Sequence, residues 1–368
     1  MVSIWETMNE ILTRSLGSSE VQPSSAKTIE INARGAMHSV AFLVDGKHIV
    51  SGSREGKIRR WRVEDGMEAG TLMDAGSWVL NIAVSRDGKW IVSGTSGGLV
   101  QVWNANDGKK VTEFKGHSRW VYAVDVSPDS TKIASGSEDR TAYVWSLSTG
   151  QRLLGPWKHD NYVFVVKFSP DGRFIATTTW RRSISVYDDR DLVVTVPIEV
   201  THSLNHSLAW SSNSKQLFAV SSGKIICLDA STGATLSQWS IPHNKFYCIA
   251  LASDGAFIAA SSKSSVSFWD ATTHEQIGSV IQHICKVSCM AISANYDIAI
   301  GGGYTITLGN LCNILPSSYC NTGVHLNQEL DLLLNEQRRR EDSLNALRTK
   351  DERPGPSIYC PAPHVLTC

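Results

Sequence analysis

Aromatic residues recur in this chain at an almost constant interval. The first four units of the repeat each end on an aromatic residue that lies 42 residues from the next: Trp61, Trp103, Trp145 and Tyr187. Three later units end at intervals of 41, 41 and 39 residues, at Leu228, Trp269 and Leu308. A chain with such a period is built from structurally equivalent units, so the structure of one unit constrains the structure of the whole.

A second marker keeps the same interval. Each unit carries a turn tetrapeptide between two apolar runs, and the seven copies read VDGK, RDGK, PDST, PDGR, SNSK, SDGA and ANYD. The flanking runs alternate with period two, which predicts short antiparallel strands. Seven units of four short strands with this period predict an all-β fold, a seven-bladed β-propeller of four-stranded antiparallel blades.

The third unit contains motifs of a known family. It carries Gly116-His117, the turn Ser127-Pro128-Asp129, the small-residue strand Ala134-Ser135-Gly136-Ser137, then Asp139 and Val144-Trp145. These motifs resemble the WD (WD40) repeat, and this unit is also similar to repeats of fungal WD-repeat proteins. The resemblance implies a hydrogen-bonded network inside the blade, formed by His117, Ser135, Asp139 and Trp145. It also implies a non-catalytic platform for protein partners.

The seventh unit lacks its outer strand. The segment Lys27–Ile31 alternates correctly and is expected to supply it, which would remove an exposed sheet edge. The competing donor is Leu311–Leu315. We therefore expect an N-terminal extension and linker at residues 1–26 and the propeller at 27–310. A C-terminal segment would follow at 311–368, with a helix over 326–350 and a disordered tail.

Composition and charge indicate which kinds of binding partner and which cellular compartment to expect. The chain has 35 Lys and Arg against 35 Asp and Glu, so it lacks the basic surface typical of direct nucleic-acid binding. Glu6 and Glu10 interrupt the N-terminal apolar stretch, and no run approaches the roughly 20 apolar residues that cross a bilayer. The eight cysteines do not suggest a secreted disulfide framework. We expect a cytoplasmic protein, with the nucleus as the alternative, that binds neither nucleic acid nor membrane.

No constellation predicts catalysis, a cofactor or a metal site. His117, Ser135 and Asp139 match a hydrolase set in residue type, but no Gly-x-Ser-x-Gly elbow accompanies them. Cys285 and Cys289, which follow His283, would lie about 13 Å apart on a strand, too far to share one tetrahedral ion. We expect a protein that is not an enzyme. An enzyme propeller stays as an alternative, and it would need acids, histidines or metal ligands around the channel.

One set of residues favours a binding surface. Large aromatic side chains recur where the innermost strand of a unit begins, and the turns between second and third strands add more residues toward the same rim of the central channel. We expect a peptide or protein partner to contact Arg54, Trp78, Arg119, Trp120, Tyr122, Glu138, Tyr162, Phe164, Trp180, Lys245 and Phe246. This composition is typical of a protein-binding hot spot. The alternative is that these rings only pack neighbouring blades together.

The function predicted from these features is a non-catalytic scaffold that binds a peptide or protein on the channel face. The alternative is a substrate-receptor or signalling subunit of a multiprotein complex, of the ubiquitin-ligase, chromatin or G-protein type. Residues 326–350 are the candidate segment for a helical partner.

Overall fold

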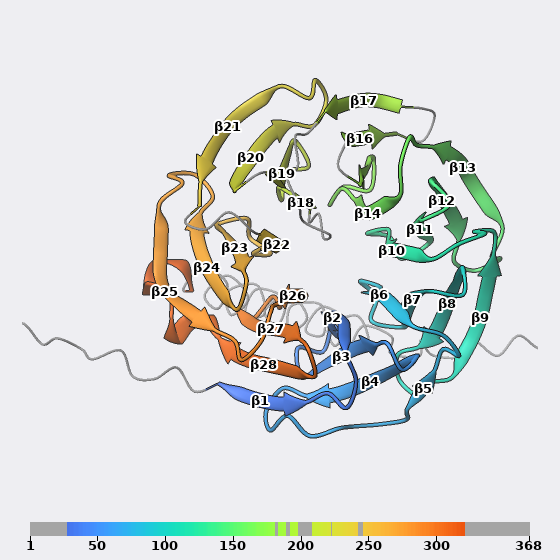
Figure 1. Cartoon of the computed structure of the whole chain (residues 1–368), viewed down its shortest axis with the longest axis horizontal. Helices are drawn as coiled ribbons and strands as arrows, with labels where there is room; N and C mark the ends of the chain where they lie inside the picture. Colours follow the sequence, from blue (N-terminus) through green and yellow to red (C-terminus); the bar gives the residue numbers. More distant parts are fainter. Residues whose placement is uncertain are drawn as a thin grey trace, which may run out of the picture. The chain divides into compact units, whose positions relative to one another are not determined.

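The computed structural model describes residues 28–180, 183–188, 192–197, 208–221, 223–241 and 246–320. Seven four-stranded antiparallel sheets surround a central axis as the blades of a propeller (Figure 1). The predicted seven-bladed fold is therefore confirmed. In the described ranges the only helical elements are two short 3-10 turns, η1 (Leu311–Asn313) and η2 (Ser317–Tyr319). The predicted N-terminal extension, the helix over 326–350 and the tail lie outside these ranges.

In each blade the strands run in order from the channel to the rim. Blade 1 contains β2 (Met37–Phe42), β3 (His48–Ser53), β4 (Lys57–Arg62) and β5 (Met73–Asp74). Blade 2 contains β6 (Val79–Val84), β7 (Trp90–Thr95), β8 (Leu99–Asn104) and β9 (Lys110–Lys115). Blade 3 contains β10 (Val121–Val126), β11 (Lys132–Ser137), β12 (Thr141–Ser146) and β13 (Arg152–Lys158). Blade 4 contains β14 (Val163–Phe168), β15 (Ile175–Thr179), β16 (Ser183–Tyr187) and β17 (Leu192–Pro197).

The remaining blades follow the same order. Blade 5 contains β18 (Leu208–Trp210), β19 (Gln216–Ser221), β20 (Lys224–Asp229) and β21 (Thr235–Ser240). Blade 6 contains β22 (Phe246–Leu251), β23 (Phe257–Ser262), β24 (Ser265–Asp270) and β25 (Gln276–Gln282). Blade 7 combines β26 (Cys289–Ile292), β27 (Asp297–Gly302) and β28 (Thr305–Asn310) with β1 (Ile29–Asn32).

The ring is closed by the first strand of the chain. β1 pairs antiparallel with β28, with Ile31 opposite Ile306, so the start of the propeller completes its last blade (Figure 1). Ile31 is buried in the cluster that also contains Trp61, while Glu30 on the other face is exposed. The predicted N-terminal donor is confirmed. The competing donor is wrong, because Leu311–Asn313 forms η1 instead of a strand.

Glycines in the second strands let adjacent blades approach closely. A Cβ added at Gly52 would lie 2.5 Å from Cγ1 of Val79, the first residue of the next blade. The equivalent Gly136 would meet Cγ1 of Val163 at 2.5 Å. Because no side chain fits in this space, the Ser-Gly-Ser pattern of these strands sets the packing distance between sheets.

Hydrogen bonds also connect the innermost strands of consecutive blades. The Ser39 hydroxyl accepts from the Ile82 amide at 2.9 Å, and the Asn81 side-chain oxygen accepts from the Val124 amide at 3.0 Å. The Asp125 carboxylate continues the series by accepting from the Phe168 amide at 2.8 Å. Each bond spans 43 residues, so the repeat holds the channel wall in a fixed register across blades 1 to 4.

Candidate partner-binding surface

The central channel contains a cavity of about 580 Å³. All seven innermost strands contribute to its wall. Seven of the residues predicted to bind a partner line it, namely Arg54, Trp78, Trp120, Tyr122, Tyr162, Phe164 and Trp180. These seven residues belong to blades 1 to 4 and line the same cavity.

Five aromatic rings form a connected arc along this wall. The members of this aromatic arc are Trp78, Trp120, Tyr122, Phe164 and Trp180. Successive ring centroids are 5.5, 6.0, 4.3 and 5.1 Å apart, distances at which aromatic pairs attract each other. The two tryptophans at its start remain accessible, with 39% of Trp78 and 37% of Trp120 exposed.

Backbone hydrogen bonds fix the aromatic residue that precedes the innermost strand of blades 2, 3 and 4. Trp78, Trp120 and Tyr162 immediately precede β6, β10 and β14. Their carbonyl oxygens accept from the amides of the turn between the second and third strands, at Ser96, Glu138 and Trp180, each at 2.9 Å. Each aromatic residue is thus attached to the turn of its own blade.

A β-bulge explains why a second large side chain follows each of these positions. The pairing of the inner strand shifts at His38 in blade 1, Leu80 in blade 2, Tyr122 in blade 3 and Phe164 in blade 4. A bulge inserts an extra residue and redirects its side chain. All four bulge residues line the cavity, at intervals of 42 residues.

His38 is a cavity-lining residue that the sequence analysis did not single out. The signal was present, because His38 lies one period before Leu80. Arg54 donates from Nε to Nε2 of His38 at 3.0 Å, and its guanidinium lies over the Trp78 ring at 5.2 Å. Burial, reinforced by the Arg54 charge, lowers the pKa of His38 to about 4. His38 is therefore neutral near pH 7 and accepts the hydrogen bond from Arg54.

Charged side chains near the arc are mostly paired. Lys167 lies 3.1 Å from Asp125, and Arg119 lies 3.9 Å from Glu138. Burial raises the pKa of Tyr122 to about 12, and electrostatic interactions with Glu138 and Tyr162 add to this increase. The Tyr122 hydroxyl therefore stays protonated.

Two of the predicted contact residues do not line the cavity, and the side chains of two others are not described. Arg119 and Glu138 pair with each other and are not among the described residues that line the cavity. Lys245 and the Phe246 side chain lie outside the described part of the chain. A binding role for all eleven predicted residues stays a prediction.

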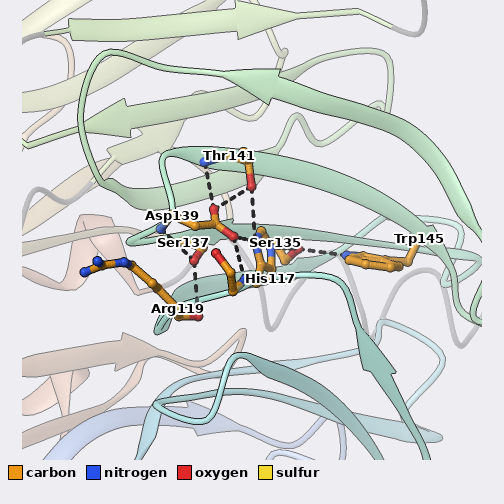
Figure 2. Close-up of polar contacts among 8 residues, drawn as sticks. His117, Arg119, Ser135, Ser137, Asp139, Thr141 and Trp145 are labelled. Atoms are coloured by element: carbon orange, nitrogen blue, oxygen red, sulfur yellow. Dashed lines mark hydrogen bonds and ion pairs between the residues drawn. The ribbon is translucent and has the colours of Figure 1, made fainter.

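The network implied by the family resemblance is present in blade 3 (Figure 2). His117 Nδ1 lies 3.0 Å from Asp139 and its Nε2 lies 2.8 Å from Ser135 Oγ, which the Trp145 indole also contacts at 2.8 Å. An indole only donates and a carboxylate only accepts, so the bonds run from Trp145 to Ser135, then to His117 and to Asp139.

The pKa of Asp139 and the burial of Ser135 support a role of this network in stabilising the blade. Burial alone would raise the pKa of Asp139, but hydrogen bonds from His117 and Thr141 outweigh it and hold the pKa well below its usual range. Ser135 has no exposed surface, and its oxygen already accepts from Trp145, so a substrate has no access to it.

Other blades keep only parts of this network. Trp61 and Trp103 donate to Ser51 and Ser93 at 2.8 and 3.0 Å, without a histidine. In blade 4 the Tyr187 hydroxyl lies 3.4 Å from His159 Nε2.

His283 and Cys285, two of the remaining histidine and thiol candidates, make hydrogen-bond contacts. His283 Nδ1 lies 2.7 Å from the Thr307 hydroxyl, and Cys285 Sγ lies 3.5 Å from His283 Nε2. In the described ranges no three His, Cys, Asp or Glu side chains are grouped to hold a metal ion. Within the same part of the chain, no helix is long and apolar enough to cross a bilayer.

Comparisons with known proteins agree with this architecture. The solved structure of U3-55K superimposes with a TM-score of 0.66 and 16% identity, covering 76% of this chain and 96% of that one; at this identity the likeness concerns the fold alone. No match was found among curated proteins. A family model described as WD domain, G-beta repeat matches residues 26–62, and one described as IFT122 first beta-propeller matches residues 78–309.

The similarity of the third unit to fungal repeats stays a prediction. WD40 propellers generally serve as non-catalytic scaffolds that bind protein partners. The model described as the IFT122 first beta-propeller matches more than half of the chain, and residues 26–62 before it match the WD-repeat model. The chain belongs to the WD40 β-propellers, in the family described as the IFT122 first beta-propeller.

Proposed function

We propose that this protein is a non-catalytic scaffold that holds a peptide or protein partner at the channel face of the propeller, within residues 27–310. The observation that carries the proposal is the aromatic arc. Five connected rings line one side of a cavity, and two of them are tryptophans with more than a third of their surface exposed.

The arc has the physical properties of an interaction hot spot. Tryptophan and tyrosine dominate hot spots because they bury large apolar areas. The Trp78 and Trp120 rings pack edge to face at 5.5 Å, and their backbones are attached to the turns behind them. A side chain that is already ordered loses little entropy on binding, so the accessible ring surface contributes fully to affinity.

Packing alone does not account for the exposed tryptophans. A ring that only connects blades gains most when both of its faces are covered, as for Tyr187 and Trp145 in the blade interiors. Trp78 and Trp120 contact each other but leave ring surface open at the channel. Their position favours a partner that covers the rest.

The test is peptide selection on the full chain. A randomised displayed peptide library is selected on the protein, and the Kd of each enriched peptide is then measured on variants. In the double variant Trp78→Ala/Trp120→Ala we expect the Kd to rise at least about tenfold, since a hot-spot side chain contributes roughly 2 kcal/mol or more.

Tyr304→Ala is the matched control. Tyr304 is an exposed aromatic residue in the turn between β27 and β28, at the same end of its blade, and it is not among the residues that line the cavity. Its replacement should leave the Kd unchanged. Peptides that bind the double variant as tightly as the native protein would contradict the proposal, as would a double variant that has lost its cooperative melting transition.

A further inference from the structure

Building on the scaffold function proposed above, we infer that the channel site recognises an acidic peptide segment. The Arg54 guanidinium would bind an Asp or Glu carboxylate, and the neighbouring Trp78 and Trp120 rings would pack against an apolar side chain of the same peptide.

The charges on the cavity wall support this ligand class. Among the described residues, those that line the cavity include two cations, Arg54 and Lys167, and no Asp or Glu. Lys167 is compensated by Asp125 at 3.1 Å. Arg54 has no carboxylate within ion-pair distance among the described residues, although Glu55 follows it in sequence. Glu55 lies against Gly35, and Glu138 pairs with Arg119. Within the described part of the chain, the Arg54 charge at the wall therefore has no carboxylate partner.

The guanidinium is held in a defined orientation. Its Nε donates to His38 at 3.0 Å, and its Cζ lies over the Trp78 ring, 5.2 Å from the ring centroid. His38 is neutral, so it orients the group without compensating its charge. Neither terminal nitrogen of Arg54 has a hydrogen-bond partner among the described residues. An arginine presented in this way matches the two oxygens of a carboxylate.

A peptide fits this arrangement better than a nucleic acid does. Duplex and single-stranded nucleic acids bind through many phosphate contacts, which need several free cations. The described residues of the wall offer one uncompensated cation beside aromatic surface, and the chain as a whole has net charge zero. A single acidic residue next to an aromatic or aliphatic residue satisfies both features of the site.

The experiment compares two randomised peptide libraries on the full chain. One library includes Asp and Glu, and the other encodes Asn and Gln in their place. We expect peptides that depend on Trp78 and Trp120 to be enriched from the acidic library, and replacement of their acid by its amide should weaken binding by about tenfold or more. Added salt should also weaken these complexes.

Arg54→Gln tests the assigned residue, with Arg86→Gln as the matched control. Arg86 is an exposed arginine in the turn between β6 and β7, at the opposite end of the blade from Trp78. Arg54→Gln should remove the preference for the acidic peptide over its amide, whereas Arg86→Gln should leave it intact. Both variants should melt close to the native temperature.

Two outcomes would overturn the inference. If the amide library yields equally tight binders that need Trp78 and Trp120 but tolerate Arg54→Gln, acid recognition is refuted and the scaffold function stands. If neither library yields a peptide that depends on the two tryptophans, both the acid recognition and the function at this site are refuted.

Discussion

Replacing Ser135 with alanine tests whether the His117 network stabilises the third blade. Ser135 Oγ accepts from Trp145 and donates to His117, and all three side chains are buried. Ser93 occupies the same strand position in blade 2 and makes the same bond to Trp103, without a histidine. The difference between Ser135→Ala and Ser93→Ala therefore isolates the bond to His117.

The expected magnitude follows from the groups left without partners. Ser93→Ala leaves one buried indole N–H unsatisfied, which costs about 1–3 kcal/mol. Ser135→Ala leaves the Trp145 N–H and the His117 Nε2 unsatisfied, so the cost should be about 2–6 kcal/mol. Ser51→Ala repeats the single loss in blade 1 and should match Ser93→Ala.

Urea denaturation at pH 7 measures these differences. The three variants should unfold with the same dependence on urea as the native protein, so that shifts in midpoint report stability. We expect Ser135→Ala to lose about 1–3 kcal/mol more than Ser93→Ala. If the two variants are equally stable, the network does not brace the blade.

Two further predictions concern ring closure and pH. Ile31→Ala should lower the free energy of unfolding by about 2–5 kcal/mol because it removes a buried side chain from β1, whereas Glu30→Ala on the exposed face of the same strand should cost little; equal thermal shifts would contradict closure by β1. The folded-state pKa of Asp139 is depressed, so its contribution is present above the unfolded-state pKa of about 3.9 and is lost as pH falls below it. In urea denaturation from pH 7 to pH 2.5, the stability gap between the native protein and Asp139→Asn should thus shrink below about pH 4. A gap that is constant with pH would refute the assigned charge state.

The fold was predictable because its determinants are local and repeated. Each unit has its own turn, its own closing residue and small residues in its second strand, and a single unit cannot bury both of its faces. The closing strand was predictable for a related reason. The alternating segment around Ile29 and Ile31 has no neighbouring strand in sequence with which to pair, and the seventh unit lacks its outer strand. Pairing the two satisfies both.

The site was predictable only in part. Trp78 and Trp120 could be placed on the channel because the register of the repeat fixes where each inner strand begins. The bulges at His38 and Tyr122 depend on pairing between strands, which the period does not reveal. The hydrogen bond between Arg54 and His38 depends on the conformations of both side chains. The sequence alone therefore could not predict that the two residues are in contact.

The proposed scaffold function requires a partner to lie on the aromatic arc. A crystal structure of the full chain with the tightest selected peptide would show where the partner binds. We predict a peptide that covers the exposed surface of Trp78 and Trp120 at the channel, with an acidic side chain on Arg54. A peptide bound along an outer strand, or at the opposite end of the blades, would refute binding at the aromatic arc.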